Sequence, residues 1–192
     1  MEWLNEPETW EFSNRKLTME VTPQTDYWRV THYGFTVDDG PFYYSQQGGE
    51  FEVTVKISAE YKNRFDQMGL MFRIDEENWI KTGIEYADGT YSYSTVITNK
   101  HSSWNRIELG EKPKFVWIKA LRRGDAVEIF YSLDGVKYVM SNLAHFPEKR
   151  NAMVGMMGAS PDGNGFRATF ENFKITHLPD ERRLKWLEKN NQ

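Results

Sequence analysis

Three side chains suited to binding a hydroxylated ligand lie on two neighbouring apolar segments. Gln67 opens the first segment, and Lys81 and Glu85 lie four residues apart on the second. If both segments are β-strands, Lys81 and Glu85 share a face and are separated by roughly 13 Å at the usual rise. An amide, an ammonium and a carboxylate on one sheet face can hydrogen-bond the hydroxyl groups of a sugar or a sugar-like metabolite.

Lys81 and Glu85 are too far apart to pair with each other, so each needs a neighbour on an adjacent strand. Gln67 or Arg73 can supply that neighbour from one side, and Thr98 from the next strand. Two interpretations are open for this face. It is either the polar floor of a binding groove or a solvated sheet surface with cross-strand ion pairs.

Aromatic side chains are the second ingredient of a sugar site, because the C–H face of a sugar ring stacks on an exposed aromatic ring. Aromatic residues make up 15% of the chain. Trp28 and Trp79 are our first candidates for stacking or lining the groove, and Tyr44 and Trp104 also lie near polar residues or turns. The alternative is that most of these rings fill the core.

We expect neither a catalytic site nor a metal site. A glycosidase needs two acids flanking the bond, and only Asp66 and Glu85 combine with other motif residues. The four histidines are isolated and the chain has no cysteine, so we expect no metal site and no cofactor. The Asp-Gly loops at 38–40 and 162–164 are interpreted as turns rather than calcium sites.

Composition restricts the classes of partner. The 192 residues suit one domain with a tail, and the 39% hydrophobic content is enough for a sizeable core. A net charge of -4 argues against a nucleic-acid partner. No secretory signal or membrane span is visible, which predicts no membrane association and a cytoplasmic location. Nothing in the composition indicates an oligomeric state.

Period-2 alternation dominates the chain and predicts an all-β antiparallel sandwich. In 50–57 the apolar residues alternate with Glu50, Glu52, Thr54 and Lys56. Further strands are expected at 68–74, 78–87, 91–98, 115–121, 126–131, 152–157 and 165–176. Asp-Gly and related turns separate several of them. After Pro179, Asp180 can cap a short helix in which Leu184 and Leu187 share a face.

The order of several motifs resembles the family known as domain of unknown function 1349, which includes a yeast regulation-of-enolase protein. The matching segments are 3–7, 25–29, 33–35, 66–69, 79–85, 96–98, 131–135 and 155–161. The resemblance implies a concanavalin A-like jelly roll of two sheets with six or seven strands each, many relatives of which bind sugars on the concave face. It implies a domain over 1–178, with 179–192 as a helical tail.

We therefore expect a non-catalytic module that binds carbohydrate in a concave-face groove. Two alternatives are kept. One is a protein-interaction regulator of a sugar-metabolism enzyme, which would use an exposed apolar patch or the tail with Trp186 and Leu187. The other is a cryptic glycoside hydrolase, although the Glu-x-Asp-x-x-Glu strand of family-16 glucanases is absent from the chain. The expected ligand contacts are Trp28, Gln67, Arg73, Trp79, Lys81, Glu85 and Thr98.

Overall fold

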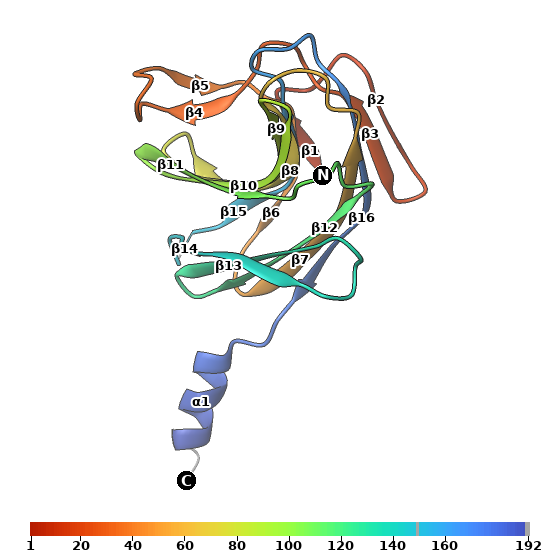
Figure 1. Cartoon of the computed structure of the whole chain (residues 1–192). Helices are drawn as coiled ribbons and strands as arrows, with labels where there is room; N and C mark the ends of the chain where they lie inside the picture. The colour runs from red at the N-terminus through yellow and green to blue at the C-terminus, as the bar shows by residue number, and fades with distance from the viewer. Residues whose placement is uncertain (149, 191–192) are drawn as a thin grey trace.

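Two seven-stranded antiparallel sheets pack face to face in a computed structural model that describes residues 1–148 and 150–190 (Figure 1). The first sheet has the order β1-β6-β15-β8-β9-β10-β11, and the second has the order β14-β13-β12-β7-β16-β3-β2. A separate two-stranded hairpin, β4-β5, lies outside both sheets. The predicted jelly-roll sandwich is confirmed.

The strands of the first sheet are β1 (Glu2–Leu4), β6 (Phe42–Gln47), β15 (Ala152–Ala159), β8 (Asp66–Asp75), β9 (Asn78–Ala87), β10 (Thr90–Asn99) and β11 (His101–Glu108). Those of the second are β14 (Val139–His145), β13 (Ala126–Ser132), β12 (Val116–Arg123), β7 (Phe51–Ala59), β16 (Arg167–His177), β3 (Lys16–Glu20) and β2 (Trp10–Ser13). All eight predicted strands are present. The short strands before residue 50, and also β11 and β14, were not predicted from the sequence.

The alternation within each strand explains how the sheets pack. In β7, Phe51, Val53, Val55 and Ile57 are buried against the first sheet, while the residues between them are only partly buried. In β8 almost every residue is buried, on both faces. Met68, Leu70 and Phe72 of β8 join the main core between the sheets, whereas Met71 belongs to a second apolar cluster on the opposite face. Something must therefore cover the outer face of the first sheet.

The cover is the hairpin formed by β4 (Tyr27–Arg29) and β5 (Thr36–Asp38), which lies over the first sheet near β9 to β11 in Figure 1. Tyr27 and Trp28 are buried in the second apolar cluster together with Trp79 and Val96 from the sheet. In the described parts of the chain, no backbone hydrogen bond joins residues 26–39 to either large sheet. The hairpin is held instead by packing and by side-chain bonds.

The predicted C-terminal helix is present as α1 (Glu181–Asn190), and it extends away from the sandwich (Figure 1). Leu184, Trp186 and Leu187 are exposed on it. Leu178, just before the helix, donates its backbone N–H to Glu50 O at 2.9 Å, which ties the end of the sandwich to the second sheet. No helix among the described residues is long and apolar enough to span a bilayer.

Candidate functional site

A cavity of about 260 Å³ lies between the hairpin and the outer face of the first sheet. Its floor comes from β8, β9 and β10 together with Asp26, which directly precedes β4. Its sides come from the hairpin, from β11 and from the loops that carry Phe65 and Pro161. The concave face is therefore not the open groove that the sequence predicted. The hairpin packs on part of the outer face of the first sheet, and the cavity lies where hairpin and sheet are not in contact.

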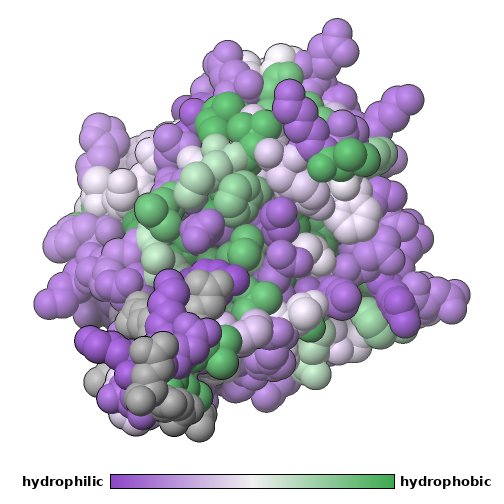
Figure 2. Space-filling model, turned by 90° about the horizontal axis from the view of Figure 1, so that it is seen from below, coloured by the Kyte–Doolittle hydropathy of each residue, from purple (hydrophilic) through white to green (hydrophobic). Residues whose placement is uncertain are grey.

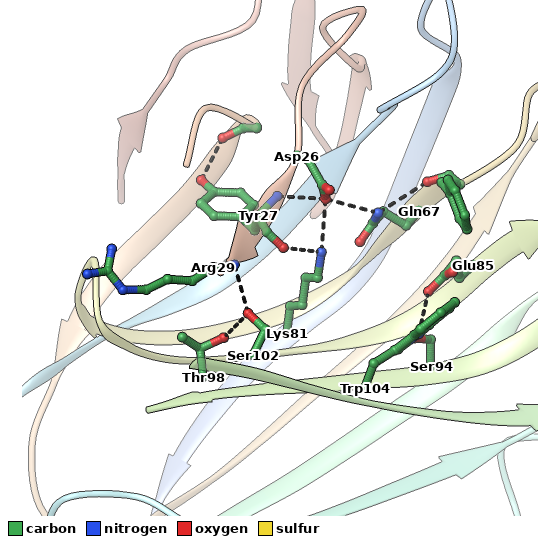
Figure 3. A network of polar contacts seen from close by, with 12 residues as sticks. Asp26, Tyr27, Arg29, Gln67, Lys81, Glu85, Ser94, Thr98, Ser102 and Trp104 are labelled. Atoms are coloured by element: carbon green, nitrogen blue, oxygen red, sulfur yellow. Dashed lines mark hydrogen bonds and ion pairs between the residues drawn. The ribbon is translucent and has the colours of Figure 1, made fainter. Parts of the chain in front are cut away.

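Lys81 is the polar centre of the floor (Figure 3). Its Nζ donates to Asp26 Oδ1 at 3.1 Å and to the Tyr27 carbonyl oxygen at 2.6 Å. Gln67 Nε2 also reaches Asp26 Oδ1, at 3.3 Å, and donates to Phe65 O at 3.2 Å. Lys81 is 6% exposed, so this ammonium both lines the cavity and joins the hairpin to the sheet.

Glu85 lies four residues after Lys81 on the same face of β9, directly opposite Gln67 of β8. Its Oε2 accepts the indole N–H of Trp104 at 3.1 Å, and the same N–H lies 3.0 Å from Ser94 Oγ. Glu85 is 4% exposed. The solvated-face interpretation is therefore wrong for Lys81 and Glu85, because both are buried and both line the cavity.

Burial raises the pKa of Glu85 above that of an ordinary glutamate. A hydrogen bond with Ser94, the positive charges of Lys81 and Arg106, and the Trp104 N–H act in the opposite direction without cancelling the effect. A carboxyl group in this position takes up a proton at a higher pH than an exposed one.

Five aromatic rings surround this polar floor, namely Trp28, Tyr33, Phe35, Phe65 and Trp104. Trp28 meets Tyr33 and Trp104 edge-on, with ring centroids 5.6 Å and 6.5 Å apart, and Tyr33 stacks on Phe35 at 5.6 Å. Tyr33, Phe35 and Trp104 are exposed. Rings beside acceptor oxygens form the mixed surface that a sugar requires, with an apolar face for the C–H groups and polar atoms for the hydroxyls.

The tip of the hairpin has a strained backbone. Val30 and His32 both have positive φ, at 64° and 65°, and a positive φ is a true outlier for a β-branched residue such as valine. The bonds Val30 N to Phe35 O and Gly34 N to Val30 O, both 2.7 Å, hold the tip in this shape. The strained turn carries Tyr33 to the mouth of the cavity, which fits the tendency of such strain to accompany ligand sites.

Four of the seven predicted contacts meet at the cavity, namely Trp28, Gln67, Lys81 and Glu85. The other three lie outside its lining. Arg73 forms a bidentate ion pair with Asp38 of β5, in which its two terminal guanidinium nitrogens donate to Oδ1 and Oδ2 at 2.8 and 2.6 Å. Trp79 is 1% exposed and packs edge-on against Tyr27. Thr98 bonds the hydroxyl of Ser102, which accepts the Arg29 backbone N–H. All three attach the hairpin to the sheet, so their expected role in stacking or ligand contact has no support in this geometry.

Asp66, one of the two acids considered for catalysis, is fully buried and serves a loop. Its Oδ2 accepts the backbone N–H groups of Lys62 and Asn63, both at 2.8 Å, and its Oδ1 accepts the Ser160 hydroxyl. Asp66 does not line the cavity. Asp26, by contrast, lies in the floor, and neither Asp26 nor Phe65 was predicted from the sequence as a lining residue. Tyr33 and Phe35 belong to the aromatic supply of the chain but were not ranked among the groove candidates. The signal available for Asp26, Tyr33 and Phe35 was the dense aromatic and acidic segment 25–39.

The described residues hold no cluster of side chains suited to binding a metal ion. Within residues 1–148 and 150–190, no group of three or more histidine, aspartate or glutamate side chains is placed to hold an ion. The Asp-Gly turn at 38–40 is occupied structurally, since Asp38 pairs with Arg73 and Asp39 Oδ1 accepts the Asp26 N–H at 2.8 Å.

Comparison with known proteins identifies the family. Residues 3–178 match the model described as protein of unknown function (DUF1349). The chain belongs to the DUF1349 family. It is 34% identical over 174 residues to the regulation of enolase protein 1 of Saccharomyces cerevisiae, an alignment that covers 91% of this chain and 88% of the relative. A crystal structure of a functionally unknown protein from S. cerevisiae superimposes with a TM-score of 0.89 at 34% identity, covering 93% of this chain and 96% of the other.

More distant structures share the fold of this DUF1349 member. A GH43 protein from Bacillus licheniformis has a TM-score of 0.68 at 15% identity, with 90% of this chain matched to 36% of that one. The carbohydrate-binding module CBM66 from Bacillus subtilis has a TM-score of 0.58 at 15% identity, covering 90% and 94% of the two chains. At these identities the likeness shows a shared jelly-roll sandwich and nothing about ligands.

Proposed function

We propose that the chain is a non-catalytic binding module whose ligand is a carbohydrate or a sugar-like metabolite, held in the cavity beneath the β4-β5 hairpin. The observation that carries the proposal is the meeting of exposed Trp104, Tyr33 and Phe35 with the buried polar groups of Lys81 and Glu85 around one hollow of about 260 Å³. The structural likeness to a carbohydrate-binding module is consistent with it.

The proposal is tested by titrating the full chain with common monosaccharides and polyols and measuring heat or a shift in melting temperature. A ligand that binds only the folded state stabilises it by RT ln(1 + L/Kd), where L is the free ligand concentration. A binding sugar should therefore raise the melting temperature progressively once its concentration exceeds Kd, and should give a saturable heat signal in calorimetry. A panel that produces neither heat nor a shift would remove carbohydrate as the ligand class.

Affinity for such a sugar is expected to fall as the pH is lowered towards the raised pKa of Glu85. Above that pKa, the Glu85 carboxylate accepts a charge-assisted hydrogen bond from a ligand hydroxyl; below it, that bond is weakened. The midpoint should lie above the ordinary glutamate value of about 4.3. Titration calorimetry across the pH range measures it.

The control for this pH dependence is Glu85→Gln, which keeps the shape of the side chain but replaces the carboxyl group with an amide that does not titrate. Its affinity should be weaker and flat with pH. Protonation of Glu85 by itself favours the folded state, because the folded-state pKa is the higher one, so its contribution to stability is full at low pH and is lost as pH rises through that pKa. Weaker binding at low pH therefore cannot arise from unfolding caused by this group. A wild-type profile as flat as that of the variant would contradict a contact between Glu85 and the ligand.

A second candidate function is supported by the 34% identity to a protein named for the regulation of enolase. In this alternative the chain contacts a sugar-metabolism enzyme through α1. Leu184, Trp186 and Leu187 are exposed on the helix, and the face of the molecule seen in Figure 2 carries apolar areas among polar ones. A helix with unpaired apolar residues is a common docking element for a partner protein.

Deletion of residues 179–192 tests this alternative. The cut falls after Leu178 and so keeps the backbone hydrogen bond from Leu178 N–H to Glu50 O. The melting temperature should therefore change little. Binding to purified enolase, measured by sedimentation or surface plasmon resonance, should be lost on deletion while sugar binding is retained. Equal enolase binding by the two forms, or none by the full chain, would contradict a docking role for the tail.

A further inference from the structure

The polar groups of the cavity floor have already used most of their donors. Asp26 Oδ1 accepts from Tyr27 N, Lys81 Nζ and Gln67 Nε2, whereas Asp26 Oδ2 has no hydrogen-bond partner in the described parts of the chain. Both hydrogens of the Gln67 amide are donated, to Asp26 and to Phe65 O, which leaves its Oε1 as the free group. Lys81 has one hydrogen left after its two bonds. The unfilled capacity is therefore mainly that of acceptors.

The charges of the floor also favour a ligand that donates hydrogen bonds over an anionic one. Two carboxylates of the lining, Asp26 and Glu85, face one ammonium, Lys81, and that ammonium is already paired at 3.1 Å. A second cation that acts on Glu85, Arg106, lies outside the lining over the Trp104 ring and bonds Ser92 Oγ. The rim adds Arg64 and Asp162, one of each sign, and Arg64 is bound to Asp88 at 3.1 Å while it covers the Phe65 ring. A phosphate would meet like charge from two carboxylates at the floor, with too few donors to replace its water.

The shape of the cavity limits the size of the occupant. Its volume of about 260 Å³ lies just below the usual range of ligand pockets, roughly 300–1,000 Å³. The trough beyond it is filled by the Arg73–Asp38 pair and by the packing of Trp79 on Tyr27. One ring fits this space, and a chain running across the whole sheet does not.

From these three observations we infer that the site accepts a single uncharged, hydroxyl-rich ring and discriminates against the phosphorylated form of the same compound. The inference depends on the proposed carbohydrate function and makes it more specific. Hydroxyl groups donate to Asp26 Oδ2, Gln67 Oε1 and Glu85, and one hydroxyl oxygen accepts the remaining Lys81 hydrogen. The C–H faces of the ring lie against Trp104 and the aromatic tip. Repulsion of the phosphate contributes to this specificity alongside the attraction of the neutral ring.

The experiment pairs each neutral compound with its phosphate at one ionic strength, using glucose and glucose 6-phosphate, mannose and mannose 6-phosphate, and inositol and inositol 1-phosphate. Dissociation constants are measured by calorimetry with the full chain. Where the neutral member binds, its phosphate is expected to bind at least tenfold more weakly. Glu85→Gln removes one negative charge at nearly constant shape. It should therefore lower the ratio of the two dissociation constants, phosphate over neutral compound, severalfold. Added salt should lower the same ratio for the wild type.

The outcomes separate the two levels of the proposal. A phosphate that binds as tightly as its neutral partner, or more tightly, overturns the charge discrimination and leaves the carbohydrate function standing. If all six compounds and a wider neutral sugar panel fail to bind, the carbohydrate function falls and the discrimination falls with it. A ratio that Glu85→Gln and salt leave unchanged would show that the selection is steric, and would overturn the electrostatic argument.

Discussion

Replacement of Trp104 by alanine should raise the dissociation constant for a neutral monosaccharide about 100-fold, the size of effect typical of a tryptophan at the centre of a contact. Trp104 is 37% exposed at the cavity, so its ring is available to a ligand. Its indole N–H also orients the Glu85 carboxylate at 3.1 Å. The substitution therefore removes a stacking surface and releases a polar contact in one step. Titration calorimetry on the folded variant measures the change.

Trp10 offers a matched control. It is 38% exposed, and its indole N–H also donates to a glutamate, Glu6, at 2.8 Å. It packs on Trp3 at 5.3 Å and does not line the cavity. Trp10→Ala should leave the dissociation constant within about twofold, since no sugar contact is removed. Equal affinities for the two variants would exclude Trp104 from the binding surface.

Replacement of Arg73 by alanine is expected to lower the free energy of unfolding by about 3 kcal/mol, because it leaves the Asp38 carboxylate partly buried without its partner. The two ions form parallel bonds of 2.8 and 2.6 Å between the sheet and the hairpin. Urea unfolding, followed by tryptophan fluorescence, measures the loss. Sugar binding should weaken as well, although Arg73 does not line the cavity, because the hairpin that forms one wall is less firmly held.

Arg150→Ala is the control for Arg73→Ala. Arg150 also bonds an aspartate, Asp75, at 3.0 Å, but its side chain is more than half exposed, and such pairs contribute about 0–1 kcal/mol. The pH dependence gives a second readout. Burial raises the pKa of Asp38, and the Arg73 guanidinium lowers it. Removing Arg73 therefore raises the pKa of Asp38 further. The loss of unfolding free energy in the variant should grow as the pH rises through the pKa of Asp38. Equal losses in both variants would contradict a structural role for the Arg73–Asp38 pair.

The architecture of the sandwich could be predicted because its information is local. Strict alternation in 50–57 and looser alternation in 78–87, with Asp-Gly turns between strands, indicate which face of a strand is apolar. The same periodicity placed Lys81 and Glu85 on one face, and the structure sets Gln67 directly opposite Glu85 as a cross-strand neighbour. The tail helix followed from its cap and its spacing of leucines.

The lining of the site could not be predicted in full, because it depends on a contact between distant segments. The β4 and β5 strands have three residues each, too few for a period to be recognised. Lys81 meets Asp26 and Tyr27 across more than fifty residues of sequence, and no local pattern records that approach. The same hairpin explains why Arg73, Trp79 and Thr98 were placed in the groove, since the residue types that line an open trough also anchor a covering segment.

Attachment of the hairpin by side chains alone gives the protein two levels of stability. Since no backbone bond joins residues 26–39 to either large sheet, we expect the amides of this segment to exchange through local opening at a lower free energy than those of the core strands. An occupant that touches Trp28, Tyr33 and Lys81 together would slow amide exchange in this segment and leave the rates of β7 and β12 unchanged. Local amide protection can thus report occupancy of the site without any assay for the ligand itself.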